Sequence, residues 1–247
     1  MTGRAGVRIG TAGWSIPKPH AALFPAAGTH LQRYAQCFNA VEINSSFYGP
    51  HKPTTYASWA AAVPPGFRFA VKLPREITHT RRLTNVQDPL ERFLQEIQAL
   101  GEALGPLLVQ LPPSLRFDSA VAGGFFDLLR GRFSGHVVCE PRHATWFTPE
   151  VDTMLAQYHI ARAMADPAPV PSAAEPGGYA GITYRRLHGS PRTYYSAYTP
   201  EYLTATAAQI KDSPAPGHEH WCIFDNTADG HATHDALALA ERLQPSG

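Results

Sequence analysis

Hydrophobic positions along the chain fall into short runs separated by longer segments of mixed polarity. Eight runs are typical of strands: Arg8–Trp14, Ala40–Phe47, Arg68–Leu73, Leu107–Leu111, His136–Glu140, Ala161–Asp166, Thr183–Gly189 and His220–Asn226. The segments between them carry the apolar spacing of helices, as in Pro89–Leu104 and Pro200–Ile210. Regular alternation of strand and helix predicts parallel strands covered by helices.

Eight such units in 247 residues predict a (β/α)8 TIM barrel, an α/β fold in which eight parallel strands are surrounded by helices. A doubly wound open sheet is the competing prediction, but it usually has fewer strands, and no G-x-G-x-x-G motif follows the first run. The stretch Pro167–Gly178, with its prolines and glycines, is expected to be a surface loop rather than a linker. We therefore expect a single TIM-barrel domain over residues 1–247.

Composition adds limits on partners and compartment. The formal charge of +1 argues against a surface coated for nucleic acid, and no apolar run is long enough to span a membrane. Met1–Gly10 lacks the charged start and apolar run of a signal peptide. The three cysteines, Cys37, Cys139 and Cys222, lack metal-ligand spacing and are expected to be unpaired. These features predict a cytoplasmic protein with no membrane partner, and they leave the oligomeric state open.

Polar residues are concentrated late in the predicted strands. In "AVEINSSFYG", Glu42 and Asn44 alternate with Val41 and Ile43, so they face the opposite side of the strand. In a TIM barrel one side is the interior, and the active site lies at the carboxyl ends of the strands. The side chains expected to converge there are Glu42, Asn44, Lys72, Gln110, Glu140, Arg142, Asp166, Arg186, His188, Asp225 and Asn226.

The acidic and basic members of this set nearly balance, so a purely structural network is one interpretation, with Glu42 paired to Lys72 on the adjacent strand. The functional interpretation is favoured because so many polar groups share the end of the fold that carries active sites. The predicted catalytic residues are Glu42, Glu140 and His188. The predicted substrate-binding residues are Asn44, Tyr48, Lys72, Gln110, Arg142, Trp146, Asp166, Arg186, Asp225 and Asn226.

Basic and aromatic residues follow several predicted strands. The stretch "KLPREITHTRRL" carries Lys72, Arg75, His79, Arg81 and Arg82, which either hold an anion or form a solvated loop. Aromatic side chains after strand ends either stack on a sugar or base or cover the core: Trp14, Phe47, Tyr48, Trp146, Phe147, Tyr194, Tyr195 and Tyr198. Ser45 and Ser46 have no evident partner base, so a serine nucleophile is not favoured.

No metal site and no cofactor are assigned. Carboxylates and one histidine from five strands could supply ligands: Glu42, Glu140, Asp166, His188 and Asp225. One histidine is few for zinc, and three cations nearby would repel a metal ion, so a divalent metal is the minor alternative. The stretches "HATH" and "GHEHW" are expected to have no role in the site.

Seven sequence blocks resemble those of one family: "IGTAGWS", "VEINSSFYG", "FAVKLPREITH", "LGPLLVQLPPSLRF", "EPRHATWF", "YRRLHG" and "FDNTADG". Over about Ile9 to Leu243 the chain resembles the YecE-like family, domain of unknown function 72. The resemblance implies a TIM barrel and no particular reaction. It places these residues at the family's motif positions: Glu42, Asn44, Lys72, Gln110, Glu140, Arg142, Arg186, His188 and Asn226.

The chain departs from the family pattern at two positions. Pro141 stands where the family usually has Phe, which removes an N–H donor beside Arg142 and puts the aim of that side chain in question. Asp225 stands where the family usually has Asn and adds a negative charge, which slightly favours the metal alternative.

Three functional hypotheses follow. The first is an enzyme, a hydrolase, lyase or isomerase, that binds a small anionic, phosphorylated or carboxylated, sugar-like ligand at the barrel mouth; two carboxylates would also allow glycoside hydrolysis. The second, less favoured, is a metal-dependent nuclease or DNA-repair protein of endonuclease IV-like fold that uses the basic run Arg75–Arg82 for nucleic acid. The third is a non-enzymatic module that binds an anionic metabolite.

Overall fold

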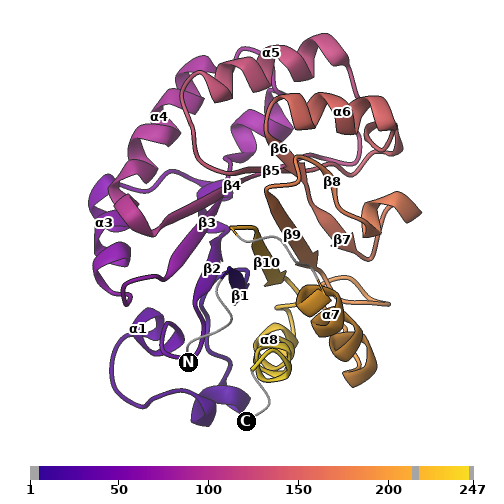
Figure 1. Cartoon of the computed structure of the whole chain (residues 1–247). Helices are drawn as coiled ribbons and strands as arrows, with labels where there is room; N and C mark the ends of the chain where they lie inside the picture. Colours follow the sequence, from indigo (N-terminus) through magenta and orange to yellow (C-terminus); the bar gives the residue numbers. More distant parts are fainter. Residues whose placement is uncertain (1–5, 213–216, 245–247) are drawn as a thin grey trace.

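The computed structural model describes residues 6–212 and 217–244 (Figure 1). The predicted domain span of 1–247 also includes residues 1–5, 213–216 and 245–247, which lie outside the described residues. Within the described ranges, no helix combines the length and apolar character needed to cross a membrane.

The strands form two hydrogen-bonded sheets. The first has the order β1 (Val7–Thr11), β10 (Glu219–Phe224), β9 (Ile182–Leu187), β7 (Met164–Asp166). The second has the order β2 (Ala40–Ile43), β3 (Arg68–Lys72), β4 (Leu104–Gln110), β5 (Val137–Glu140), β6 (Ile160–Arg162), β8 (Gly177–Gly178). Neighbours are parallel except β6 and β8, which are antiparallel. The α/β class and the parallel pairing of the predicted strands are confirmed.

Helices flank the strands on the outside, as Figure 1 shows. They are α1 (His30–Tyr34), α3 (Pro53–Ala61), α4 (Gln87–Ile97), α5 (Ser119–Arg130), α6 (Pro149–Gln157), α7 (Pro200–Asp212) and α8 (His231–Arg242). The short helix α2 (Ser45–Tyr48) follows the end of β2. The prediction of a helix over Pro200–Ile210 is confirmed. The predicted helix Pro89–Leu104 is interrupted after α4, because Gly101 adopts φ 53° inside a following 3-10 turn and the chain then enters β4.

Closure of the strands into one barrel is not confirmed by their pairing. The predicted strand Ala161–Asp166 is divided at Ala163 into β6 and β7, which belong to different sheets. Between β1 and β2 the described residues form an isolated parallel bridge, Ala12–Glu42. The two strands approach closely at Gly10, where a side-chain Cβ would collide with the Ala40 carbonyl oxygen.

Two further predictions need correction. The predicted strand Ala40–Phe47 ends early, at Ile43, and α2 begins at Ser45 directly after Asn44, whose backbone is already helical. The predicted loop Pro167–Gly178 contains a 3-10 helix, Pro171–Ala174, and strand β8. The three cysteines are unpaired, as predicted.

Strands from both sheets enclose a second, smaller apolar cluster distinct from the main core. It consists of Ala40, Ala70, Leu108, Val138, Ala161, Ala163, Ile182, Tyr184, Trp221 and Ile223. Tyr184 and Trp221 stack with ring centroids 5.8 Å apart, and the alanines leave room for them. Because side chains two positions apart share a face, the next inward residue of each strand lies one layer further toward the carboxyl end. This spacing places the polar strand ends in a layer above the cluster.

Candidate functional site

Arg186, on β9, is the centre of this polar layer. Its side chain is 1% exposed. Its Nε and Nη2 atoms donate to the two carboxylate oxygens of Glu42 at 3.0 and 2.6 Å. Nη1 donates to Glu140 Oε2 at 2.8 Å, and Nη2 also donates to Asp225 Oδ2 at 3.0 Å. One guanidinium thus joins three carboxylates, and the pair with Glu42 has the bidentate geometry that makes such bonds strong.

Glu42, on β2, is fully buried and has one more partner. The hydroxyl of Tyr184 donates to its Oε2 at 2.8 Å. Burial raises the pKa of the Tyr184 phenol well above 10, and the Glu42 charge raises it further, so the hydroxyl remains a donor. The two oxygens of Glu42 accept three hydrogen bonds in all. The structural interpretation paired Glu42 with Lys72, but Arg186 takes that place.

His188, just beyond β9, lies between two carboxylates. Its Nε2 is 2.9 Å from Glu140 Oε1, and its Nδ1 is 3.0 Å from Asp225 Oδ2. Arg142 Nη2 lies 2.6 Å from Glu140 Oε1 and 2.8 Å from His188 Nε2. A doubly protonated ring can donate to both carboxylates, and a neutral ring with its proton on Nδ1 can accept from Arg142. Either form of the ring therefore has a hydrogen-bond partner in the cluster. Arg142 also points into the site despite Pro141.

Two of the carboxylates beside Arg186, Glu140 and Asp225, are held in their charged form. Burial alone would raise the pKa of Glu140, but the charges of Arg186, Arg142 and His188 outweigh it and hold the pKa well below 4.5. Burial of Asp225 is likewise outweighed by Arg186 and by the hydrogen bond with His188, so its pKa lies below 3.8. Both groups are therefore anions near neutral pH.

The variant Asp225→Asn is expected to lose about 2 kcal/mol of unfolding free energy near neutral pH, because hydrogen bonds to charged groups contribute about this much. Since the pKa of Asp225 is lowered on folding, its contribution is present above pH 3.8 and is lost as the pH falls through the folded pKa. Urea unfolding of both proteins between about pH 7 and about pH 3 should therefore show the difference shrinking. A difference independent of pH would contradict this account of Asp225.

Lys72, at the end of β3, is the cation of the site with the fewest partners. Within the described residues no carboxylate oxygen lies within 4.0 Å of its Nζ. The amine lies over the ring of Phe47, 4.1 Å from its centroid. Burial lowers the pKa of Lys72, and the charge of Arg186 adds to that, against the carboxylates of Glu42 and Glu140. A half-buried amine beside an ion cluster is well placed to meet a ligand anion.

Two predicted site residues lie apart from the ion cluster. Asp166 accepts a hydrogen bond from the Tyr198 hydroxyl at 2.9 Å. The amide nitrogen of Asn226 donates to Asp235 Oδ2 at 2.8 Å and to the Ser196 carbonyl at 2.9 Å. These contacts connect the strand ends with the segment before α7 and with α8.

The remaining predicted residues occupy varied positions. Trp146 is 1% exposed, and its Nε1 donates to the Leu115 carbonyl at 2.9 Å. Gln110 donates to the Leu111 carbonyl at 3.0 Å, and Tyr48 is 82% exposed. Asn44 follows β2 directly, and its buried Oδ1 has no hydrogen-bond partner among the described residues. Asn44 therefore has an acceptor available at the site.

Sequence reasoning missed Tyr184 and His51. Tyr184 lies two positions before Arg186 on the same strand, a spacing that could have identified it. The expectation that Ser45 lacks a base is wrong, because His51 Nε2 lies 2.8 Å from Ser45 Oγ. Only the turn of α2 brings these two residues together, and partial burial of the His51 ring lowers its pKa.

The carboxylates of the site surround an arginine side chain, and they do not surround a position that a metal ion could occupy. Arg186 contacts Glu42, Glu140 and Asp225, as described above. In the part of the chain that the structure describes, no three His, Cys, Asp or Glu side chains are grouped to hold a metal ion.

A family model described as "Protein of unknown function DUF72" matches residues 8–247. The chain belongs to the DUF72 family. Among curated proteins, this DUF72 chain is 32% identical to UPF0759 protein YecE of Escherichia coli K12 over 174 residues, which are 68% of this chain and 61% of YecE. YecE of E. coli O157:H7 is 33% identical over 143 residues, which are 57% of this chain and 50% of that protein. The chain thus matches 50% to 61% of the length of these relatives.

Solved DUF72 structures share this fold. A DUF72 protein of Enterococcus faecalis V583 superposes with a TM-score of 0.79 at 20% identity, covering 98% of this chain and 96% of that chain. A DUF72 protein of Thermotoga maritima MSB8 superposes with a TM-score of 0.78 at 23% identity, covering 97% and 99%. At these identities the likeness concerns the fold.

Proposed function

We propose that this DUF72 protein is an enzyme that binds a small anionic, sugar-like molecule at the carboxyl ends of β2, β3, β5 and β9. The observation that carries this proposal is that the cations of the site differ in how many of their donors are already bonded to carboxylates. Arg186 uses its donors on buried carboxylates, whereas Lys72 has no carboxylate within 4.0 Å among the described residues. Arg142 also keeps its buried Nε without a partner in that set. Lys72 and Arg142 are thus the groups with donors left for a ligand anion.

The sugar-like character is supported by Asn44. Its buried Oδ1 can accept a hydrogen bond that no described residue supplies. A buried acceptor without a donor costs free energy, and a ligand hydroxyl would remove that cost. A phosphorylated or carboxylated sugar combines hydroxyls with a negative charge. A ligand of this class would use Asn44, Lys72 and Arg142 together.

His188 is the proposed proton carrier, since its Nε2 already lies between Glu140 and Arg142. The ring is fully buried, and Tyr194 contacts it edge-on with centroids 5.8 Å apart. Tyr194 is 46% exposed and adopts φ 71°, a conformation unfavourable for a side chain of its size. Movement of Tyr194 would give a ligand access to His188 Nε2. Glu140 would then orient the ring, and Glu42 would hold Arg186.

Closure of the two sheets into a (β/α)8 barrel is part of this proposal, because active sites of that fold lie at the carboxyl ends of its strands. Three observations support it: the Ala12–Glu42 bridge, the close approach at Gly10, and an apolar interior shared by strands of both sheets. Arg186 of one sheet also binds Glu42 and Glu140 of the other.

Oxyanion binding can be measured through thermal stability. Millimolar phosphate or sulfate should raise the melting temperature of the wild type more than matched chloride does, because a ligand that binds only the folded state stabilises it, by about 2.7 kcal/mol at a hundredfold excess over Kd. The variant Lys72→Met should lose most of this shift. Lys52→Met, which removes an exposed lysine, should retain it. Equal shifts in all three proteins, or none in any, would contradict anion binding by Lys72.

Turnover separates an enzyme from a binding module. A panel of phosphate esters and sugar acids should include a substrate whose conversion is lost in His188→Gln. Oxyanion stabilisation with no turnover across the panel would favour the non-enzymatic alternative. No observation in the structure favours the metal-dependent nuclease over the anion-binding enzyme.

A further inference from the structure

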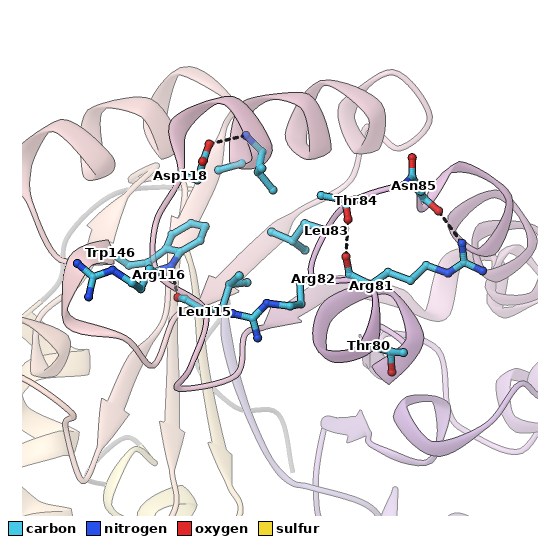
Figure 2. A pocket seen from close by; sticks show the side chains of 12 residues that line it. Thr80, Arg81, Arg82, Leu83, Thr84, Asn85, Leu115, Arg116, Asp118 and Trp146 are labelled. Carbon is cyan, nitrogen blue, oxygen red and sulfur yellow. Dashed lines mark hydrogen bonds between the residues drawn. The ribbon is translucent and has the colours of Figure 1, made fainter.

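The basic run that follows β3 divides into two groups in the structure. In the first group, Arg81 pairs with Glu76, with 2.8 Å between Nη2 and Oε1, and Arg82 donates to the hydroxyl and the carbonyl of Ser114 at 3.0 and 2.8 Å. Figure 2 shows the two guanidinium groups directed to different sides, that of Arg81 toward Asn85 and that of Arg82 toward the segment after β4. The protein itself therefore engages both of these arginines.

His79 belongs to the second group. It lies in a single π-helical turn, Glu76–Thr80, and such turns are frequent at functional sites. Its Nδ1 lies 2.9 Å from the hydroxyl of the buried Thr78, whereas its Nε2 has no hydrogen-bond partner among the described residues. Because the Thr78 hydroxyl can donate to the Pro74 carbonyl at 3.4 Å, it can accept a hydrogen bond from Nδ1–H. Nε2 is then the ring nitrogen that is left to meet a ligand.

One aromatic ring connects His79 with the amine of Lys72. The His79 ring meets the ring of Phe47 at 82° with centroids 4.9 Å apart, and Nζ of Lys72 lies 4.1 Å from the centroid of the same Phe47 ring. Phe47 belongs to α2, and the buried Ser46 beside it donates to the Lys72 carbonyl at 2.6 Å, which fixes this short helix against the end of β3. Lys72 and His79 therefore share one corner of the site.

The charges that act on His79 are positive. They come from Lys72 on β3 and from Arg75 and Arg82 on the segment that carries His79 itself. Burial of the ring and these charges lower the pKa of His79 to about 4, so the ring is neutral near neutral pH. Arg75 is exposed, and its guanidinium has no hydrogen-bond or ion-pair partner in the part of the chain that the structure describes. An anion at this corner would raise the pKa of His79, because its negative charge opposes the field of the cations.

We propose that His79 is a further ligand-binding residue of the anion site, and that its Nε2 takes up a proton from solvent when a phosphate group binds beside it and Lys72. This inference rests on the proposed function, since the anion is the one that Lys72 holds. Two positively charged donors match a phosphate dianion, whereas a carboxylate carries a single negative charge. The ligand class is thereby narrowed from phosphorylated or carboxylated molecules to phosphorylated ones.

Inorganic sulfate is the probe, because it stays a dianion over the pH range in which His79 would gain its proton. If sulfate favours proton uptake, protons must favour sulfate binding by the same factor. The Kd of sulfate for the full chain, measured by calorimetry or from thermal shifts, should therefore fall at least about fivefold between about pH 8 and about pH 6. Acetate, a monoanion over this range, should bind more weakly than sulfate throughout.

The variant His79→Gln keeps a neutral hydrogen-bonding group near the position of Nε2 but cannot gain a charge. At about pH 8 its Kd for sulfate should lie within about threefold of the wild-type value, because only a neutral hydrogen bond is exchanged. Its Kd should not change with pH, a result that a purely structural role of His79 would not produce. His51→Gln is the matched control, because burial also lowers the pKa of the His51 ring, but that ring contacts Tyr56 and Trp59 instead of Phe47. This control should keep the pH dependence of the wild type.

The outcomes separate this inference from the proposed function. If Lys72→Met loses the sulfate effect while His79→Gln keeps the pH dependence, the role of His79 is overturned and the anion site at Lys72 stands. If sulfate does not bind the wild type at any pH, both are overturned. Loss of the pH dependence in His51→Gln as well would assign it to a general effect on folding, and equal affinities for acetate and sulfate would mean that the site does not select a dianion. Either result would overturn the inference.

Discussion

Replacing Arg186 with methionine is expected to remove at least about 3–5 kcal/mol of unfolding free energy, the usual cost of breaking a buried ion pair by deleting one partner. Arg186 is bonded to Glu42, Glu140 and Asp225. Without the guanidinium, three buried or nearly buried carboxylates would face one another, and each would favour its neutral form. Urea or guanidinium unfolding of the variant and the wild type measures the loss.

The pH dependence of the Arg186→Met variant distinguishes this mechanism from a general packing defect. Carboxylates that are buried without a cation have folded pKa values above their unfolded values. Their protonation then stabilises the folded state as the pH falls, so the loss should shrink between about pH 7 and about pH 5. Arg92→Met is the control, because Arg92 is 62% exposed and forms only a surface ion pair of 3.4 Å, for which about 0–1 kcal/mol is expected. A loss below about 1 kcal/mol in Arg186→Met would show that the cluster is solvated.

The variant Glu140→Gln should lose about 3 kcal/mol or more, within the range for broken buried pairs. Glu140 is 1% exposed at its side chain and binds Arg186 at 2.8 Å and Arg142 at 2.6 Å. Its pKa is held well below 4.5 despite burial, so the lost partner is an anion at neutral pH. This outcome would identify Glu140 as a residue that positions Arg186, Arg142 and His188, and would remove it from the predicted catalytic residues.

Glu91→Gln provides the comparison for Glu140→Gln, because Glu91 pairs with Arg132 at the surface, where solvent screens the ion pair and its loss costs little. Denaturant midpoints and slopes of both variants and the wild type decide the matter. A cost for Glu140→Gln as small as that for Glu91→Gln would mean that water reaches Arg186 and Arg142. Glu140 would then return to the catalytic residues as a candidate acid or base.

The alternation of side chains along each strand was enough to predict which charged residues face the interior. It places Glu42, Lys72, Glu140 and Arg186 on the inner face of their strands, and the structure has them there above a shared apolar cluster. Alternation does not say which charges pair. The structural interpretation paired Glu42 with Lys72 on the neighbouring strand, but the partner of Glu42 is Arg186, 144 residues further along the chain. An arginine side chain is long enough to cross the interior, and the local sequence does not show which distant carboxylate it will bind.

Residues at the last position of a strand or beyond it were harder to place. Asp166 and Asn226 stand late in their runs, as Glu140 does, but local loops turn their side chains toward Tyr198 and Asp235. The division of Ala161–Asp166 into two strands was also beyond prediction. A run of small apolar residues shows that a segment is buried, but it does not show that its first half hydrogen-bonds to one sheet and its second half to another.

Arg186, His188 and Asp225 belong to one sheet and its strand ends, whereas Glu42 and Glu140 belong to the other. The residues of the proposed site therefore also form the ion pairs that connect the two sheets. Substitution of any of these residues is therefore expected to change folding stability as well as the proposed chemistry. New ligand specificities in this fold should then arise mainly in the segments beyond the strands. There Asn44, Arg142 and Tyr194 can be replaced while the ion pairs between the two sheets are retained.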